Sequence, residues 1–186
     1  MRFLLLAGFS FLFMPVHSQK KLLIIGSSTS TCYFGPSSFD NCYVTRLQKL
    51  YADKGQPFLL DNRAVAGDNC YHGMPLDFAP PTGRNAPRPY YNITEGLAAN
   101  PDVVLVNYPS NGYDTYSVEE VMFCLRTIRK TVNNAGKPCY ITTTQPRNYP
   151  GEDARRKMAE LKERILLEFG TYAIDFWTEL ANPVNK

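Results

Sequence analysis

The feature that most constrains the fold of this chain is an alternation of short aliphatic runs with longer amphipathic segments. The runs "KLLIIG" (21–26) and "DVVLVN" (102–107) are dominated by aliphatic side chains, as in strands that are buried on both faces. Segments with helical periodicity separate these runs from one another. Such a pattern predicts right-handed crossover connections, and therefore one α/β domain with a central parallel sheet between layers of helices.

Along the whole chain the same pattern predicts strands over 21–26, 57–67, 102–111, 139–146 and 171–177. It predicts helices over 41–55, 93–101, 117–138 and 151–170. The third of these helices has the clearest signals, because Ser117 caps it and Glu120 completes a capping box. Residues 68–92 form a long loop rich in proline, glycine and aromatic residues, and a loop of this length is usually functional or an insertion.

The N-terminus differs in character from the rest of the chain. After Arg2, residues 3–16 form an apolar run that is shorter than the roughly 20 residues a membrane-spanning helix needs. Small residues near Ser18 fit a signal-peptidase site, so we expect a signal peptide over 1–18 and a single domain over 19–186. The mature protein would then be secreted or periplasmic, with no stable membrane anchor.

The charge of the chain excludes one class of partner. Lysine and arginine number 20 against 17 aspartate and glutamate residues, which gives a formal net charge of +3. Charges of both signs alternate and form no basic block. A nearly neutral chain of this kind gives no nucleic-acid signal, so we expect none as a partner.

Five cysteines in an exported chain make disulfides plausible, and their odd number leaves at least one thiol unpaired. Cys32 and Cys70 both follow predicted strand ends, so we expect their pairing first. Cys124 lies among apolar neighbours and is expected in the core. The only histidines are His17 and His72, so no zinc site is expected, and nothing in the sequence calls for a cofactor.

Three polar or small residues follow three successive predicted strands. Ser28 comes after the first strand, Gly67 ends the second and Asn111 ends the third. Singly, each fits an ordinary turn or cap residue. The carboxyl ends of parallel strands share one edge of a sheet, where ligands bind. Together the three residues therefore predict a serine nucleophile with an oxyanion hole, in which each donor contributes on the order of 3 kcal/mol.

The segments "GSSTS", "AVAGDN" and "VNYPSN" resemble the first three blocks of the SGNH (GDSL-type) hydrolase superfamily, in order and spacing. The resemblance covers essentially the mature chain and includes "DFW" on the last strand. It implies a flavodoxin-like α/β/α sandwich in which Ser28 is the nucleophile. The backbone N–H groups of Ser28 and Gly67 and the Asn111 side chain would form the oxyanion hole.

The sequence departs from the family pattern at two points. Ser27 stands where the family motif has aspartate, a variation that the family tolerates. The final Asp-x-x-His block is absent, since Asp175 is followed by Phe-Trp-Thr and no histidine follows His72. Three explanations remain open: an incomplete C-terminal part, a natural homologue that binds without turnover, or His72 as a substitute base.

The leading hypothesis is a secreted serine esterase that hydrolyses acyl, preferably acetyl, esters, on small molecules or on polysaccharides. The 68–92 loop contains the aromatic residues Tyr71, Phe78, Tyr90 and Tyr91. Their rings would either stack on sugar rings of the substrate or simply pack the loop. A second hypothesis is a catalytically inactive carbohydrate-binding module with the same fold. A third is a phosphate- or flavin-binding domain that uses "GSSTS" as an anion site, which export disfavours.

Overall fold

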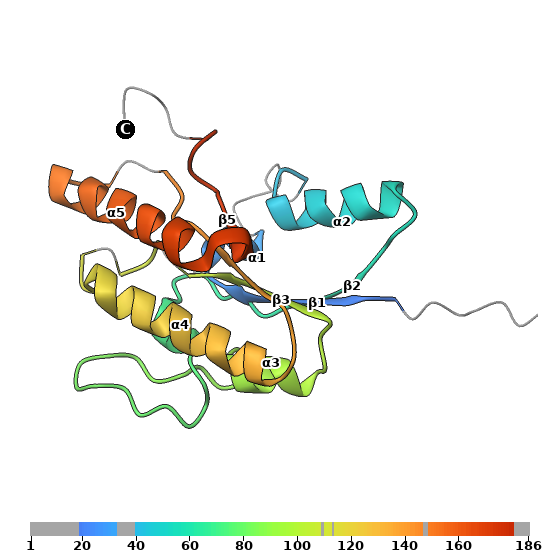
Figure 1. The fold of residues 1–186 in the computed structure, drawn as a ribbon, viewed down its shortest axis with the longest axis horizontal. Helices are drawn as coiled ribbons and strands as arrows, with labels where there is room; N and C mark the ends of the chain where they lie inside the picture. The colour runs from blue at the N-terminus through green and yellow to red at the C-terminus, as the bar shows by residue number, and fades with distance from the viewer. Residues whose placement is uncertain (1–18, 33–39, 109, 113, 147–148, 181–186) are drawn as a thin grey trace, which may run out of the picture.

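A five-stranded parallel sheet forms the centre of the computed structural model, which describes residues 19–32, 40–108, 110–112, 114–146 and 149–180 (Figure 1). Its strands are β1 (Lys21–Gly26), β2 (Leu59–Asn62), β3 (Val103–Asn107), β4 (Cys139–Thr142) and β5 (Ala173–Ile174). They are arranged in the order β2-β1-β3-β4-β5. The predicted parallel α/β architecture is confirmed, and the expected signal peptide lies outside the described residues.

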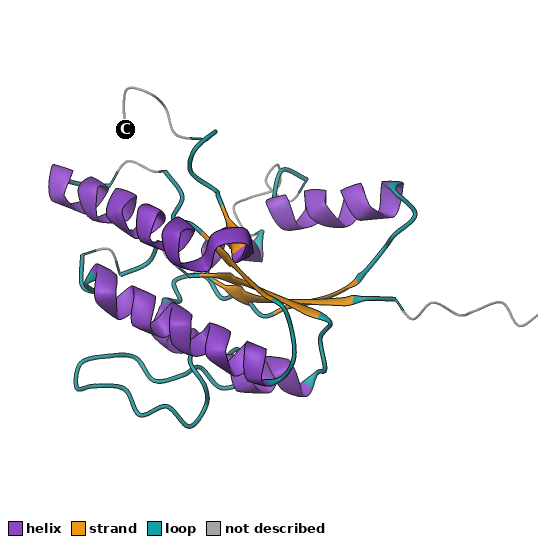
Figure 2. Cartoon of the chain, viewed as in Figure 1, coloured by secondary structure: helices purple, strands orange, loops and turns teal. Residues whose placement is uncertain are grey.

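Helices cover both faces of this sheet (Figure 2). They are α1 (Ser28–Thr31), α2 (Tyr43–Asp53), α3 (Ile93–Ala98), α4 (Val118–Asn134) and α5 (Glu152–Phe169), with 3₁₀ turns η1 (Cys70–Gly73) and η2 (Gly170–Tyr172). The predicted capping box of α4 is present: the Ser117 hydroxyl accepts the Glu120 N–H at 3.1 Å, and the Glu120 carboxylate accepts the Ser117 N–H at 2.9 Å.

The alternation of side chains along β1 divides the core into two layers. Leu23 and Ile25 point toward the layer that contains α3, α4 and α5, whereas Leu22 and Ile24 point toward α2. Strand side chains alternate between the two faces of a sheet, so a strand that is apolar on both faces needs helices on both sides. This requirement explains why the aliphatic runs of the sequence became central strands.

The second strand is shorter than predicted. β2 ends at Asn62, because the Asn62 side chain accepts the Ala64 N–H at 3.1 Å and turns the backbone out of the extended conformation. Two further backbone bonds to β1 follow, from Arg63 N–H to Ile24 O and from Val65 N–H to Gly26 O. Gly67 therefore lies in a turn that is still attached to the end of β1.

The predicted Cys32–Cys70 disulfide is wrong. Cys32 pairs instead with Cys42, with the two Cα atoms 5.2 Å apart. Cys32 belongs to the core layer beside α2, whereas Cys70 belongs to the layer beside α4, so the sheet separates the two thiols. Cys124 is fully buried, as predicted, and Cys70 and Cys139 are also unpaired and buried.

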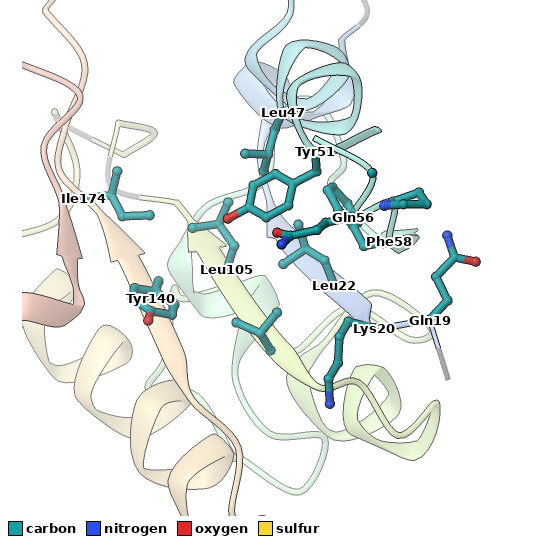
Figure 3. Close-up of a pocket in the computed structure, with 13 residues that line it drawn as sticks. Gln19, Lys20, Leu22, Leu47, Tyr51, Gln56, Phe58, Leu105, Tyr140 and Ile174 are labelled. Carbon is teal, nitrogen blue, oxygen red and sulfur yellow. The ribbon is translucent and has the colours of Figure 1, made fainter. Parts of the chain in front are cut away.

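α2 covers only part of its face of the sheet. Beside it runs an apolar groove of about 1170 Å³, lined by side chains of α2, the strands and the β2 approach (Figure 3). Leu47 and Tyr51 of α2 reach into the groove together with Leu22 and Leu105. The groove reaches Lys20 and the beginning of the strands. None of the three predicted site residues lines it, since they follow the opposite, carboxyl ends of the strands.

Within the ranges that the structure describes, no helix combines the length and the apolar character required for a membrane span.

Candidate active site

The first part of the candidate site is the turn between β1 and α1. β1 ends at Gly26, where an added Cβ would lie 2.8 Å from the Asn107 carbonyl oxygen, so only glycine fits beside β3. Ser27 then donates its N–H to the same oxygen at 3.0 Å. Ser28 is the first residue of α1 and is half-buried.

The Ser28 hydroxyl is not used to cap α1. It makes no hydrogen bond with any residue in the described ranges, and the Ser27 hydroxyl makes no cap bond either. The Ser28 N–H likewise has no acceptor among these residues, as expected for the first turn of a helix. The turn therefore presents a hydroxyl and an adjacent N–H, the pair that a nucleophile with an oxyanion donor requires.

The second part of the site is the turn at Gly67, which has a φ of +87°. The turn is closed by a bond from Asp68 N–H to Val65 O at 3.1 Å. Gly67 is exposed, and an added Cβ would meet nothing within 4 Å. Its N–H has no acceptor among the described residues, so it is available to a ligand.

The third part of the site is Asn111, after β3. Its Nδ2 donates to the Asp68 carbonyl oxygen at 2.7 Å. The side chain thus bonds across to the second loop. An amide nitrogen carries two hydrogens, so one N–H remains for a ligand.

Backbone and side-chain bonds hold the three loops together. Val65 N–H bonds to Gly26 O and Ser27 N–H bonds to Asn107 O, each at 3.0 Å, and Asn111 bonds to Asp68. The structure therefore ties the loops that carry Ser28, Gly67 and Asn111 to one another at one edge of the sheet.

A fourth loop, which the strand order also places at this edge, joins it through Gln145, a residue to which the sequence assigned no role. The Gln145 Oε1 accepts hydrogen bonds from the hydroxyls of Thr29 at 3.1 Å and Ser110 at 3.0 Å. Its Nε2 donates to the Asn107 Oδ1 at 2.9 Å. Gln145 thus links the turn that carries Ser28 to the loop that carries Asn111. Its place just after β4 was the available signal, because β4 ends at the same edge.

A buried ion pair lies directly behind the Gly67 turn and was also missed. The side chain of Asp68 is 1% exposed, and its carboxylate receives the guanidinium of Arg88 at 2.6 and 2.8 Å. The Nδ1 of His72 lies 3.7 Å from the same carboxylate. Arg88 is 20 residues distant from Asp68 in the sequence, so no local pattern indicates the pair.

Neither a family model nor a curated protein sequence matches this chain. Its structure is similar to a putative lipolytic protein of the G-D-S-L family from Desulfitobacterium hafniense, with a TM-score of 0.65 and 14% identity over 90% of this chain and 83% of that chain. It is also similar to a GDSL-like lipase from Bacteroides thetaiotaomicron, with a TM-score of 0.64 and 14% identity over 92% and 76% of the two chains. The psychrotrophic esterase EstA from Pseudoalteromonas sp. gives a TM-score of 0.60 and 18% identity over 84% and 77%.

The chain has the SGNH-hydrolase fold. The esterase AlinE4, described as a member of the SGNH-hydrolase family, also shares it, with a TM-score of 0.59 and 15% identity over 86% of this chain and 77% of that chain. This likeness confirms the predicted architecture. At these identities it identifies no catalytic residue of the present chain.

Within this SGNH fold, the geometry of His72 disfavours a role as a substitute base. Its Nδ1 accepts the Asn69 N–H at 3.1 Å and completes the capping box of η1, so Nε2 carries the ring proton. In this tautomer Nε2 cannot take a proton from Ser28. Burial lowers the pKa of His72 and outweighs the opposing charge of Asp68.

Asp175 holds the turn that follows β5 of the SGNH fold. Its carboxylate accepts the N–H groups of Trp177 at 2.7 Å and Thr178 at 3.1 Å, and it is also bonded by the Thr178 hydroxyl. Burial alone would raise the pKa of Asp175. These hydrogen bonds together lower it by more than burial raises it, so the pKa is lower than that of an ordinary aspartate. Asp175 therefore acts locally, as an ionised cap of the turn.

The described part of the chain contains no group of three histidine, cysteine or acidic side chains able to hold a metal ion. The groups that the described residues present at this edge are the Ser28 hydroxyl and neutral hydrogen-bond donors.

Proposed function

We propose that this protein hydrolyses acyl esters through Ser28. The observation that carries the proposal is the 2.7 Å hydrogen bond from Asn111 Nδ2 to Asp68 O. This bond sets a neutral side-chain donor beside the Gly67 turn, and the backbone N–H groups of Gly67 and of Ser28 have no acceptor among the described residues. Three donors of this kind match the negative charge that develops on a carbonyl oxygen during acyl transfer.

In the proposed reaction the Ser28 Oγ attacks the ester carbonyl carbon while its proton passes to a general base. The carbonyl oxygen becomes an oxyanion and accepts bonds from the N–H groups of Ser28 and Gly67 and from Asn111. The alkoxide then leaves and takes up a proton, which produces an acyl-enzyme. Water repeats the attack and releases the acid and free Ser28.

The base is the one group of this mechanism that the described residues do not supply to Ser28. The test therefore provides it as free imidazole. With imidazole present, p-nitrophenyl acetate hydrolysis is expected to exceed the imidazole background in the unaltered chain, and Ser28→Ala should return it to that background. Ser27→Ala is the matched control, because Ser27 lies in the same motif and its hydroxyl caps nothing.

A fluorophosphonate probe gives a second readout that does not depend on turnover. With imidazole again present as the base, mass spectrometry should locate the phosphonyl group on Ser28 in the unaltered chain and in Ser27→Ala. If the chain remains unlabelled, or is labelled at another serine, the assignment of Ser28 as nucleophile is wrong.

For the substrate, we propose acetyl esters of carbohydrates. Fewer of the four loop aromatic residues support this proposal than the sequence suggested. Tyr71 is 2% exposed and is therefore inaccessible to a sugar, and Phe78 is partly buried against the same core. Tyr90 and Tyr91 are 74% and 40% exposed, and they support the proposal. Acetylated xylan should release more acetate than p-nitrophenyl butyrate releases acid at equal ester concentration; the reverse order would reject carbohydrate esters.

A second candidate is a binding module without turnover, favoured by the absence of a described base at Ser28. It predicts binding of deacetylated xylan oligosaccharides together with no phosphonylation and no imidazole-dependent hydrolysis. Isothermal titration calorimetry combined with the two assays above separates the candidates.

We further propose that the protein acts outside the cytoplasm. The apolar N-terminal segment supports this proposal, and so does a disulfide between Cys32 and Cys42. N-terminal sequencing of protein recovered from the medium or periplasm should begin at Gln19.

A further inference from the structure

Asp68 is a buried acidic residue beside the candidate site, with a side chain that is 1% exposed. A buried carboxylate requires a partner that satisfies its charge and its oxygen lone pairs. Arg88 supplies both, with Nη2 at 2.6 Å from Oδ1 and Nε at 2.8 Å from Oδ2. This two-point geometry fixes the orientation of the carboxylate as well as its position.

Arg88 is itself held on both sides of its backbone. Its N–H donates to the His72 carbonyl oxygen at 2.9 Å, and its own carbonyl oxygen accepts from the Asn92 Nδ2 at 2.9 Å. Asn92 is fully buried and caps α3. The guanidinium therefore projects from a segment that is fixed to both η1 and α3, and it can act as a rigid support.

Asp68, which Arg88 binds, is connected to two donors of the proposed oxyanion hole. The peptide that joins Gly67 to Asp68 follows directly after the Gly67 N–H, and the Asp68 carbonyl oxygen accepts the amide of Asn111 at 2.7 Å. Any displacement of Asp68 would therefore move the Gly67 donor and release the Asn111 donor together.

We propose that Arg88 is a positioning residue for the oxyanion hole, acting through Asp68 on Gly67 and Asn111. The inference rests on the proposed function, because it assigns Arg88 to the same site. Among the described residues, no hydrogen bond joins Arg88 to Ser28 or to Asn111. The effect of Arg88 on the site therefore passes through the buried carboxylate of Asp68.

The same loop offers a second arginine–carboxylate pair, Arg84 with Glu120, in which neither partner is bonded to Asp68. Arg84 binds Glu120 at 2.6 Å through Nε, and both partners are partly exposed. Glu120 belongs to the first turn of α4 and does not contact the Gly67 turn. A purely structural role, in which each arginine only fastens the 68–92 loop, predicts similar consequences for the loss of either one.

The experiment measures, in the presence of imidazole as the base, the rate of Ser28 phosphonylation by a fluorophosphonate in Arg88→Gln, Arg88→Lys and Arg84→Gln. Arg88→Gln should slow labelling by about 10- to 100-fold, since a misplacement of about 1 Å in an active site costs up to about 100-fold. Arg88→Lys keeps the positive charge but loses the two-point geometry of the guanidinium. Its labelling rate should lie between those of Arg88→Gln and the unaltered chain. Arg84→Gln should label at the rate of the unaltered chain.

A spectroscopic readout reports the positioning itself. In a ¹H–¹⁵N spectrum the Asn111 side-chain amide should shift in Arg88→Gln and stay in place in Arg84→Gln. Arg88→Gln leaves a buried charge unpaired, so Asp68→Asn with Arg88→Gln provides a second variant that keeps the Asp68 backbone carbonyl and removes the charge. This double variant should label faster than the single one and more slowly than the unaltered chain.

The possible failures are distinguishable. If the unaltered chain is not labelled at Ser28, the proposed function falls, and the role of Arg88 falls with it. If the unaltered chain is labelled and every folded variant without the Arg88 guanidinium matches Arg84→Gln, only the inference is overturned.

Discussion

The amide nitrogen of Asn111 lies 2.7 Å from the carbonyl oxygen of Asp68, so the loop after β3 is bonded to the turn after β2. Asn111 and Asp68 are 43 positions apart in the sequence. The bond therefore orients the Asn111 side chain through a loop that is distant from it in the sequence.

Asn111→Ala removes this bond together with one oxyanion donor. We expect imidazole-dependent hydrolysis and Ser28 labelling to fall by about 100- to 1000-fold, the range found when a single oxyanion-hole donor is removed. The free energy of unfolding should change only slightly, because Asn111 is only half-buried. Asn133→Ala on the exposed end of α4 is the control. Equal rates for the two variants would remove Asn111 from the oxyanion hole.

Gly67→Ala tests the backbone of the second loop. Gly67 has a φ of +87°, and an added Cβ meets nothing within 4 Å, so the cost is conformational, about 1–2 kcal/mol of unfolding free energy. Gly55→Ala is matched, with a φ of +69° and equally open surroundings far from Ser28. Urea unfolding should show similar losses for both, whereas only Gly67→Ala should slow labelling. A labelling rate unchanged from that of Gly55→Ala would contradict a role for the Gly67 turn.

Stability should depend on pH through His72. Burial holds the pKa of His72 below its ordinary value in the folded protein. Between that lowered pKa and about 6.5, the unfolded chain binds more protons than the folded one. The free energy of unfolding should therefore decrease as the pH falls from about 7.5 to 5.5. The bond from Asn69 N–H to Nδ1 should be lost when the ring is protonated, because it needs the Nδ1 lone pair.

His72→Gln provides the comparison for this pH effect. Glutamine removes the titrating ring, whereas its amide oxygen can still accept the Asn69 N–H in the η1 capping box, so the urea midpoint of this variant should vary less over pH 7.5 to 5.5. Parallel pH curves for the unaltered chain and His72→Gln would show that another group is responsible.

The disulfide makes a prediction about covalent structure. A non-reduced digest should contain a peptide cross-linked through Cys32 and Cys42, with Cys70 and Cys124 alkylated only after unfolding. Replacing Cys32 and Cys42 by serine should lower the unfolding free energy by about 2–3 kcal/mol, the loop-closure value for a ring of this size. Detection of a Cys32–Cys70 peptide would contradict the structure.

The sequence by itself determined the class of fold and the order of its elements. β1, β3 and α4 were predictable because their signals are local: aliphatic runs for strands buried on both faces, and a Ser117–Glu120 capping box for the helix. The positions of Ser28, Gly67 and Asn111 at one edge followed from the same order, since parallel strands end together.

Only the tertiary structure decided which residues meet across that edge. The early end of β2 depends on one hydrogen bond from the Ala64 N–H to the Asn62 side chain, and the partner of Cys32 depends on which face of the sheet each thiol occupies. The Asp68–Arg88 pair arises because a loop of 20 residues returns to the Gly67 turn. Contacts of this kind join residues that share no periodicity or spacing, so they exist only once the chain has packed around the sheet.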